Sequence, residues 1–320
     1  MSVTSAEWLR LIEQEYLSSF ITSGGSAVKF AVMPDPGTAD LVSEQLDSLA
    51  KQHGLVRASL DSAATRLHMI QDVFFGIARQ IDWLGLAQSF MELLFAKQAY
   101  LWPRVGEPMT IHELADANAV DLTIMQRDVR QWLTAGIMRD NAMAQDFRIA
   151  MTQLCLERLA PNGADSAPVA PVLEWLRGEL RTIGPLKSTS IYSQVTRHNA
   201  RPMLRSLGRW LRLLGHKGLL LTLDIRRLAH VVPVGSVGVR YTPAAVLDAY
   251  EVLRQLIDEA DHFEGFFLAV LADPEFVNGD ARRSIDSYTA LKMRIWDDVK
   301  AKERDNPLAP LVTLTQEGAP

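Results

Sequence analysis

The sequence has little of what several classes of protein require. It contains one cysteine, Cys155, among 320 residues, which excludes a disulfide framework within the chain and fits a reducing cytoplasm. No apolar run reaches the roughly 18 uncharged residues that span a bilayer, and the N-terminus lacks the basic start of a signal peptide. The net charge is −5, so no global positive field attracts nucleic acid or anionic lipid. We therefore expect a cytoplasmic protein that makes no membrane contact.

The residues that could bind a metal ion or act as a nucleophile also show no recognisable spacing. The histidines have no ligand spacing and no supporting cysteines, so we expect no metal site; they stand at positions 53, 68, 112, 198, 216, 230 and 262. Cys155 lies among apolar residues of a predicted helix, which favours a core position over a catalytic thiol. We predict no catalytic residue from these groups.

Apolar runs of strand length alternate with helical patterns along the chain. Buried strands separated by helices are typical of a parallel sheet covered on both faces, so we predict an α/β fold. The predicted strands are "AVKFAVM" (27–33), "LVRASLD" (55–61), "GLLLTLD" (218–224), "GFFLAVLAD" (265–273) and "LVTLT" (311–315). Helical spacing is expected over 6–21, 39–53, most of 66–99, 172–182, 199–214, 243–260 and 284–302.

The chain changes character at Pro103, and "PNGADSAPVAP" (161–171) is its clearest loop. We therefore predict three segments. Residues 1–100 and 161–320 form the two parts of the α/β core, and residues 101–160 form an inserted helical module.

The stretch "KFAVMPDPGTADL" (29–41) has the strand–turn–helix layout of a phosphate-binding loop. Such a loop needs G-x-x-x-x-G-K-[ST], with Gly37 and Thr38 here falling between the required positions. Those positions are instead Pro34, Ala39, Asp40 and Leu41.

Each of these replacements removes one function of the loop. Pro34 has no N–H donor, and Leu41 cannot bind magnesium. Asp40 replaces a lysine, and exchanging attraction for repulsion at about 4 Å changes the interaction by up to roughly 8 kcal/mol at an effective dielectric near 20. From the residues alone, a coincidental Pro/Gly turn is the favoured interpretation.

Six further stretches resemble one family, the ATP-binding proteins of BREX-type phage-defence loci (BrxD-like P-loop ATPases). They occur in the family's order and cover most of the chain except about 90–150. They are "EWLRLIEQEYLSSFITSGGSAVKF", "VRASLDSAATRLHMIQDVFFGIARQI", "LEWLRGEL", "RHNARPMLRSLGRWLRLLGHKGLLLTLD", "EGFFLAVLADPEFVNGDARRSIDSYTALKMRI" and "NPLAPLVTL".

The resemblance implies an AAA+-like ATPase core. Asp224 then matches the acid that helps to hold magnesium, and Ile225 stands where the family has the glutamate that activates water. The resemblance also implies a helical lid after "NPLAPLVTL", which this chain, ending at Pro320, is expected to lack. Together with the altered loop, these departures predict a degenerate nucleotide site, made of Pro34, Gly37, Thr38, Asp40 and Asp224, that uses no cofactor.

Residues 109–141 resemble a helix-turn-helix or winged-helix-like module. Ala115 would occupy the tight packing point, and 123–134 would be the recognition helix, with Arg127 and Arg130 beside Gln126 and Gln131 as donors. Residues 104–148 hold five arginines and seven acids, so 5 − 7 gives a net charge of −2, which is poor for a polyanion. A packing or partner-docking module therefore remains the alternative.

Two further groups of arginines are candidate contacts. The predicted helix 199–214 carries one basic stripe, which is either a solvated face or a track for phosphates or an acidic partner; it consists of Arg201, Arg205, Arg209 and Arg212. Arg282 and Arg283 follow a predicted strand. They lie either in a surface turn or where an arginine can reach a neighbour's nucleotide.

Three hypotheses follow from these patterns. The first is a non-hydrolysing pseudo-ATPase, a scaffold or regulatory subunit of an antiphage complex that contains an intact ATPase homologue or a DNA-acting enzyme, with homo- or hetero-oligomers expected. The second is a DNA-binding protein that uses 109–141 and the basic stripe. The third is an ATPase whose site is completed by a partner chain.

Overall fold

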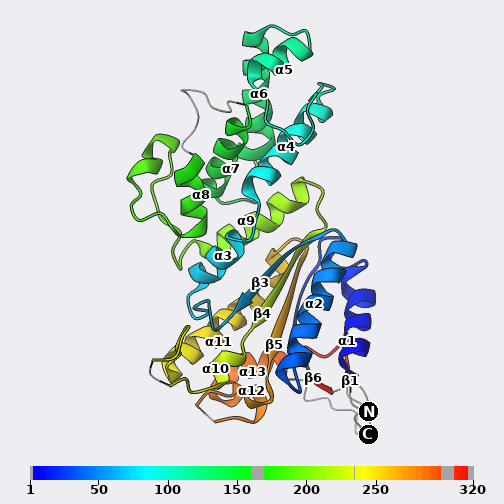
Figure 1. Ribbon diagram of the computed structural model, residues 1–320, viewed down its shortest axis with the longest axis vertical. Coiled ribbons are helices and arrows are strands. Elements are labelled where there is room, and N and C mark those ends of the chain that lie inside the picture. Colours follow the sequence, from blue (N-terminus) through cyan, green and yellow to red (C-terminus); the bar gives the residue numbers. More distant parts are fainter. Residues whose placement is uncertain (1–2, 160–168, 234, 281, 297–305, 316–320) are drawn as a thin grey trace. The chain divides into compact units, whose positions relative to one another are not determined.

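The computed structural model describes residues 3–159, 169–233, 235–280, 282–296 and 306–315. The chain divides into two compact units (Figure 1). The sheet unit comprises residues 1–77 and 216–320, and the helical unit comprises residues 78–215. The predicted insert, 101–160, lies within the helical unit, which extends further along the chain in both directions.

The described strands of the sheet unit form one six-stranded sheet in which all the pairs are parallel. Their order is β1-β6-β2-β5-β4-β3. This confirms the predicted AAA+-like α/β fold. The strands are β1 (Val3–Thr4), β2 (Ser26–Val32), β3 (Leu55–Asp61), β4 (Gly218–Asp224), β5 (Phe266–Ala272) and β6 (Leu311–Thr315).

Five of these strands coincide with the predicted ones to within a residue at each end. The exception is β1, a two-residue strand that pairs Val3 with Leu314. It was not predicted, because two residues cannot form a recognisable apolar run.

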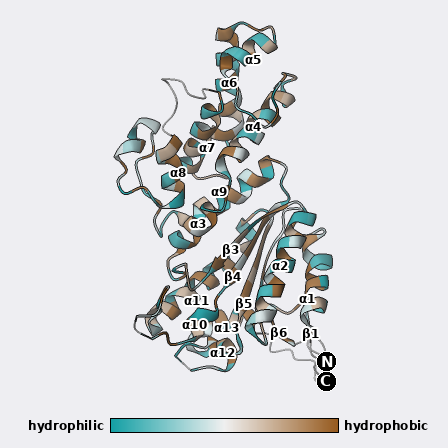
Figure 2. Ribbon diagram, viewed as in Figure 1, coloured by the Kyte–Doolittle hydropathy of each residue, from teal (hydrophilic) through white to brown (hydrophobic). Residues whose placement is uncertain are grey.

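Helices cover both faces of the sheet. On one face, Trp8 and Ile12 of α1 (Ser5–Ile12) and Leu46 of α2 (Pro36–Gln52) share a buried core with Phe267 of β5. On the other face, Phe30 of β2 stacks on Phe276 at a ring distance of 6.2 Å. Figure 2 shows the central strands as largely hydrophobic, as a doubly covered parallel sheet requires. The remaining helical segments of this unit are η1 (Glu13–Leu17), α3 (Ile70–Ala78), α10 (Arg226–Ala229), α11 (Pro243–Asp258), η4 (Ala260–His262), α12 (Pro274–Asn278), η5 (Ile285–Ser287) and α13 (Thr289–Ile295).

Two glycines let β4 and β5 begin side by side. A Cβ on Gly218 would lie 2.0 Å from the carbonyl oxygen of Gly265, and Gly218 has φ +148°. Gly265 itself has φ +66°, a left-handed conformation that favours glycine. The close approach lets Leu219 donate its N–H to that carbonyl at 2.7 Å, which aligns the two strands that carry most of the site described below.

Several predicted helices have different limits in the structure. Helix α2 begins at Pro36 and not at residue 39. The stretch 66–99, predicted to be largely helical, contains the two helices α3 and α4 (Trp83–Lys97), with Asp82 capping α4. The predicted helix 284–302 corresponds to η5 and α13. The end of that prediction, and most of the predicted loop 161–171, lie outside the described residues.

The helical unit is built around buried aromatic rings. Phe90 of α4 packs against Trp210 at a ring distance of 4.7 Å, and Trp83 packs against Phe147 at 6.0 Å. Among the described residues, no helix of either unit combines the length and the apolar character that crossing a membrane requires. After α4, the elements are α5 (Ile111–Ala117), α6 (Leu122–Leu133), η2 (Thr134–Met138), α7 (Gln145–Glu157), α8 (Val169–Arg177), η3 (Gly184–Thr189) and α9 (Ala200–Leu213).

Candidate nucleotide site at the carboxyl edge of the sheet

A cavity of about 530 Å³ opens at the carboxyl ends of β2, β3, β4 and β5. This edge is where open parallel sheets bind ligands, because the loops that leave neighbouring strands converge there. We call this cavity the edge cavity. Its lining residues are Met33, Pro34, Asp35, Pro36, Asp61, Ala63, Asp224, Arg226, Arg227, His230, Asp273, Pro274 and Glu275.

The connection from β2 to α2 is short, and the side chain of its last residue caps the helix. It has three residues, because β2 ends at Val32 and α2 begins at Pro36. Asp35 caps the helix: its carboxylate accepts the Thr38 N–H at 3.0 Å and the Thr38 hydroxyl at 2.6 Å. Pro36 has no N–H to offer. The helix N-terminus, which binds phosphate in nucleotide sites, is therefore already occupied by a carboxylate.

The positions aligned with the phosphate-loop motif lie mostly in the helix and not in a loop. Gly37 is the second residue of α2, and Ala39 is buried. The side chain of Asp40 is 75% exposed, and Leu41 is 60% exposed. Only Pro34, of the four aligned positions, lines the edge cavity. These residues do not fit a triphosphate held by a phosphate-binding loop, since a curled backbone and a cation are both missing from this connection.

An arginine holds the acid at the end of β4. Arg226 donates from Nε to Oδ1 and Oδ2 of Asp224 at 3.0 and 2.9 Å, and both side chains are about three-quarters buried or more. Asp40 lies 3.6 Å from the same guanidinium. The hydrogen bond to Asp224 raises the pKa of Arg226 above its ordinary value. The carboxylate that the resemblance assigns to magnesium is thus neutralised by its own chain.

Arg226 is not among the residues predicted for the site, although the sequence contains a signal for it. Two arginines follow the strand after a single intervening residue in "LDIRR" (223–227). Ile225 between them and the acid is 2% exposed, and its N–H donates to the Leu271 carbonyl at 2.9 Å. The position expected to carry a catalytic glutamate therefore belongs to the apolar core.

The second arginine of this run, Arg227, forms hydrogen bonds with the backbone. Arg227 donates to the carbonyls of Val237 at 2.7 Å and Val239 at 3.3 Å. It therefore fixes the loop before α11.

Arg283 fits neither of its two predicted positions, a surface turn or a place from which it reaches a neighbour's nucleotide. It is 6% exposed, and its guanidinium donates to the carbonyls of Leu228 at 3.2 Å, His230 at 3.1 Å and Tyr241 at 2.8 Å. Burial and these three bonds hold it inside the sheet unit. Arg282, the next residue back, is exposed.

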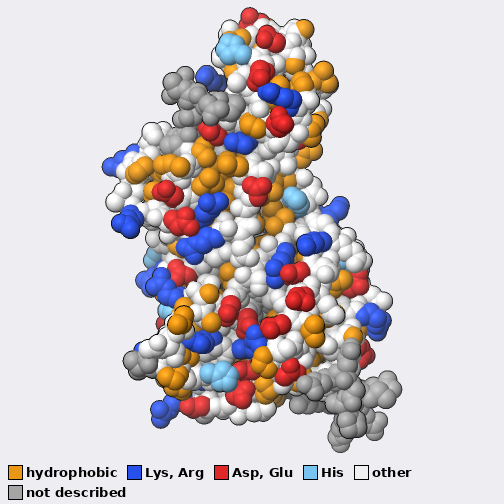
Figure 3. All heavy atoms as spheres, in the orientation of Figure 1, with side chains coloured by type: hydrophobic (Ala, Val, Ile, Leu, Met, Phe, Trp, Pro, Cys, Tyr) orange, Lys and Arg blue, Asp and Glu red, His pale blue; other side chains and the backbone are white. Residues whose placement is uncertain are grey.

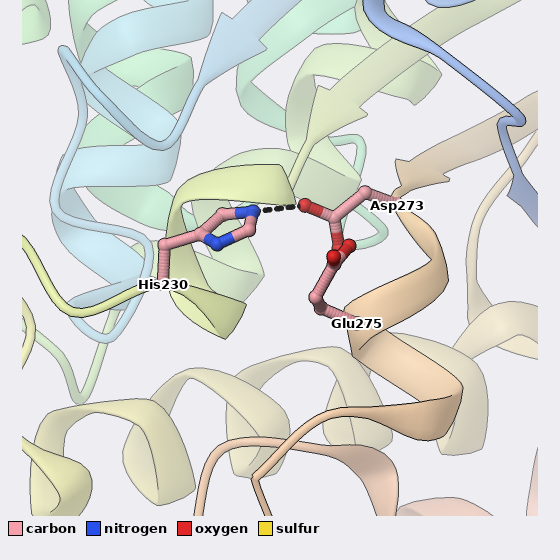
Figure 4. Close-up of side chains that lie close together, drawn as sticks. All are labelled: His230, Asp273 and Glu275. Atoms are coloured by element: carbon pink, nitrogen blue, oxygen red, sulfur yellow. Dashed lines mark hydrogen bonds and ion pairs between the residues drawn. The ribbon is translucent and has the colours of Figure 1, made fainter.

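Three side chains from two strand ends gather at one side of the edge cavity. His230 follows α10, while Asp273 and Glu275 follow β5, and one ligand atom from each lies within 4.8 Å of the others (Figure 4). The imidazole of His230 pairs with Asp273. Burial is the main cause that raises the pKa of Asp273. No residue spacing in the sequence indicates this group, because His230 and Asp273 are distant in the chain and meet only through the pairing of β4 with β5.

The charges around the edge cavity are unfavourable to a triphosphate. Its lining has two arginines, one histidine and five carboxylates, and the arginines are engaged by Asp224 and by backbone carbonyls. Lys and Arg side chains are interspersed with Asp and Glu on the face shown in Figure 3. The five carboxylates are those of Asp35, Asp61, Asp224, Asp273 and Glu275.

The comparison with known families decides the family of the chain. The model for the BREX system ATP-binding protein BrxC/D matches residues 110–317, which is more than half of the sequence. The chain belongs to this family. The match confirms the resemblance and connects the protein with a phage-defence system. No curated protein and no solved structure matches.

The family match covers Asp224 and the group around His230, and it begins after the connection from β2 to α2. It also covers the candidate contacts of the helical unit.

Helix α5 begins with a capping box, in which Thr110 and Glu113 bond each other's backbone N–H, and Ala115 is buried as predicted.

Helix α6 of this family member exposes the predicted donors. Arg127 and Arg130 are exposed on α6, together with Gln126 and Gln131. Arg127 pairs with Asp128 of the same helix at 3.0 Å, which reduces the charge that it presents.

The basic stripe on α9 is not a fully solvated face. Its four arginines are all partly buried, and Arg209 pairs with Asp140 at 2.8 Å. That pair joins α9 to the turn after η2 within the helical unit. At least one arginine of the stripe therefore stabilises the unit itself.

Proposed function

We propose that this family member is a non-hydrolysing pseudo-ATPase. It acts as a scaffold or regulatory subunit of a phage-defence complex, beside an intact ATPase homologue or a DNA-acting enzyme. The observation that supports this most directly is the pair between Asp224 and Arg226. A magnesium ion at Asp224 would have to displace a bonded, largely buried guanidinium from the same chain.

Two further observations agree with this proposal. Asp35 already occupies the N-terminus of α2, so a phosphate there would meet a carboxylate in place of free N–H groups. Ile225 offers no base to an attacking water. Each feature removes a different requirement of phosphoryl transfer: binding of the phosphate, binding of the metal ion, and activation of the nucleophile.

The proposal predicts that the purified chain releases no phosphate from ATP and Mg²⁺ above the rate of its own Asp224→Asn variant. Arg226→Ala should also give no turnover, because Ile225 and the short connection remain. A coupled phosphate-release assay measures both. Turnover by the wild-type chain that Asp224→Asn abolishes contradicts the proposal.

A mixture with the intact homologue from the same locus separates a scaffold from a shared active site. For a scaffold, Asp224→Asn leaves both the turnover of the mixture and protection against phage unchanged. A loss of turnover in that mixture would instead mean that this chain completes an ATPase site.

The exposed donors on α6 support a second candidate function, the binding of duplex DNA. In that case, Arg130→Ala weakens binding at every salt concentration and reduces the slope of log K against log salt by about one. Arg104→Ala is the matched control, because Arg104 pairs with Glu113 of α5 in the same unit. Gel-shift titrations at low salt measure both variants. The absence of a shifted band from the wild-type chain at low salt contradicts this function.

A further inference from the structure

The group of His230, Asp273 and Glu275 has the composition of a metal site. It offers one imidazole nitrogen and two carboxylate oxygens within 4.8 Å of one another. Figure 4 shows the imidazole of His230 directed at the Asp273 carboxylate, with the Glu275 carboxylate beside it. Imidazole and carboxylate together are ligands for zinc and similar divalent ions, whereas magnesium prefers oxygen ligands alone.

An oxygen of Asp273 gives an independent reason to expect a bound cation. Oδ2 pairs with His230, but Oδ1 is buried and has no hydrogen-bond partner among the described residues. A buried carboxylate oxygen without a partner is costly, and such groups are usually satisfied by protein, water or an ion. The Glu275 carboxylate lies near it, so a second negative charge shares the space.

The two arginines of the edge cavity are already engaged. Arg226 binds Asp224, and Arg227 binds the carbonyls of Val237 and Val239. Within the described lining, these bonds leave the His230 imidazole as the nitrogen-bearing side chain next to the two carboxylates.

The backbone around the three side chains is held in place. Arg283 donates to the carbonyls of Leu228 and His230, which fixes the segment that presents the imidazole. Asp273 is the N-cap of α12, and its carbonyl accepts the Phe276 N–H at 3.1 Å. The ligand atoms are therefore carried by fixed backbone, and His230 and Glu275, which are exposed, can turn towards an ion.

We infer that His230, Asp273 and Glu275 bind one divalent transition-metal ion, best matched by Zn²⁺. Three protein ligands leave a fourth position open towards the edge cavity, as in zinc sites that accept water or an anionic ligand. The inference does not depend on the proposed function, because the ion would bind whether or not the chain hydrolyses ATP.

Calorimetric titration of the full chain with ZnCl₂ tests the site. We expect one Zn²⁺ per chain, with an affinity that His230→Ala lowers by at least about tenfold, since even changes next to metal ligands cost 10- to 100-fold. Asp273→Asn should weaken binding similarly. His262→Ala is the matched control, because His262 is an exposed histidine of the same unit outside the group.

Thermal unfolding distinguishes a metal site from a simple ion pair. Zn²⁺ should raise the melting temperature of the wild-type chain and of His262→Ala, and leave that of His230→Ala unchanged. His230 is half-exposed, so this variant is expected to fold even if Asp273→Asn does not. Either of two results overturns the inference: no Zn²⁺ binding by the wild-type chain, or equal binding by His230→Ala.

Discussion

Replacing Arg283 with alanine is expected to lower the free energy of unfolding of the sheet unit by about 3–5 kcal/mol. The substitution leaves the carbonyls of Leu228, His230 and Tyr241 without their shared donor. A buried polar group without a partner costs about 1–3 kcal/mol, and water entering the space left by the side chain offsets part of the sum. Urea unfolding followed by circular dichroism measures the loss.

Arg282→Ala is the matched control for this prediction. Arg282 is adjacent and exposed, so its removal should change the free energy of unfolding by no more than about 0.5 kcal/mol. Arg283→Lys keeps the charge but lacks the planar fork that reaches three carbonyls, and should recover only part of the loss. Equal stability of Arg283→Ala and Arg282→Ala would show that the buried guanidinium has no structural role.

The second large effect is expected in the opposite direction. Lys29→Met should stabilise the sheet unit at pH 7 by about 1–3 kcal/mol, because a buried charge is replaced by an apolar side chain of similar length. Lys29 is 6% exposed in β2. Its ammonium donates to the Leu308 carbonyl and lies 4.7 Å from the centre of the Tyr16 ring, contacts that offset part of the cost of burial.

This prediction has a defined pH dependence. Burial lowers the pKa of Lys29 to about 8, whereas an unfolded lysine titrates near 10.4. Between these values the unfolded chain binds more protons, so the stability of the wild-type chain rises with pH across this window. The gain in the free energy of unfolding from Lys29→Met is therefore largest below pH 8 and decreases towards pH 10. Urea titrations of both chains at pH 7 and pH 10 measure it, and a variant less stable than the wild-type chain at pH 7 contradicts it.

The strands were predictable because parallel strands buried on both faces are continuous apolar runs. In β4, for example, the run Leu219–Leu221 needs no alternation to be recognised. The start of α2 was missed for a different reason. "DPGT" fits a degenerate phosphate loop, although Asp35 followed by Pro36 is also a common start of a helix. A local pattern of this kind is compatible with both a phosphate loop and a helix start. The bonds from Thr38 to Asp35, which only the structure shows, distinguish the two.

The chemistry of the edge cavity was less predictable than the fold. Asp224 was identified through the family resemblance, but the partner that neutralises it depends on the direction of the Arg226 side chain. His230 and Asp273 come together because β4 and β5 are neighbours in the sheet, a long-range pairing that residue spacing does not reveal. Sequence patterns therefore located the edge of the sheet, while the pairs and bonds at that edge required the structure.

The three residues between β2 and α2 limit what substitutions at this connection can achieve. A phosphate cradle is made by consecutive backbone N–H groups, so its size depends on how many residues it contains and not on which side chains they carry. Point substitutions at Pro34 or Asp40 would change charge and conformation but add no length. Triphosphate binding at this connection would therefore require an insertion and not only the exchange of single amino acids.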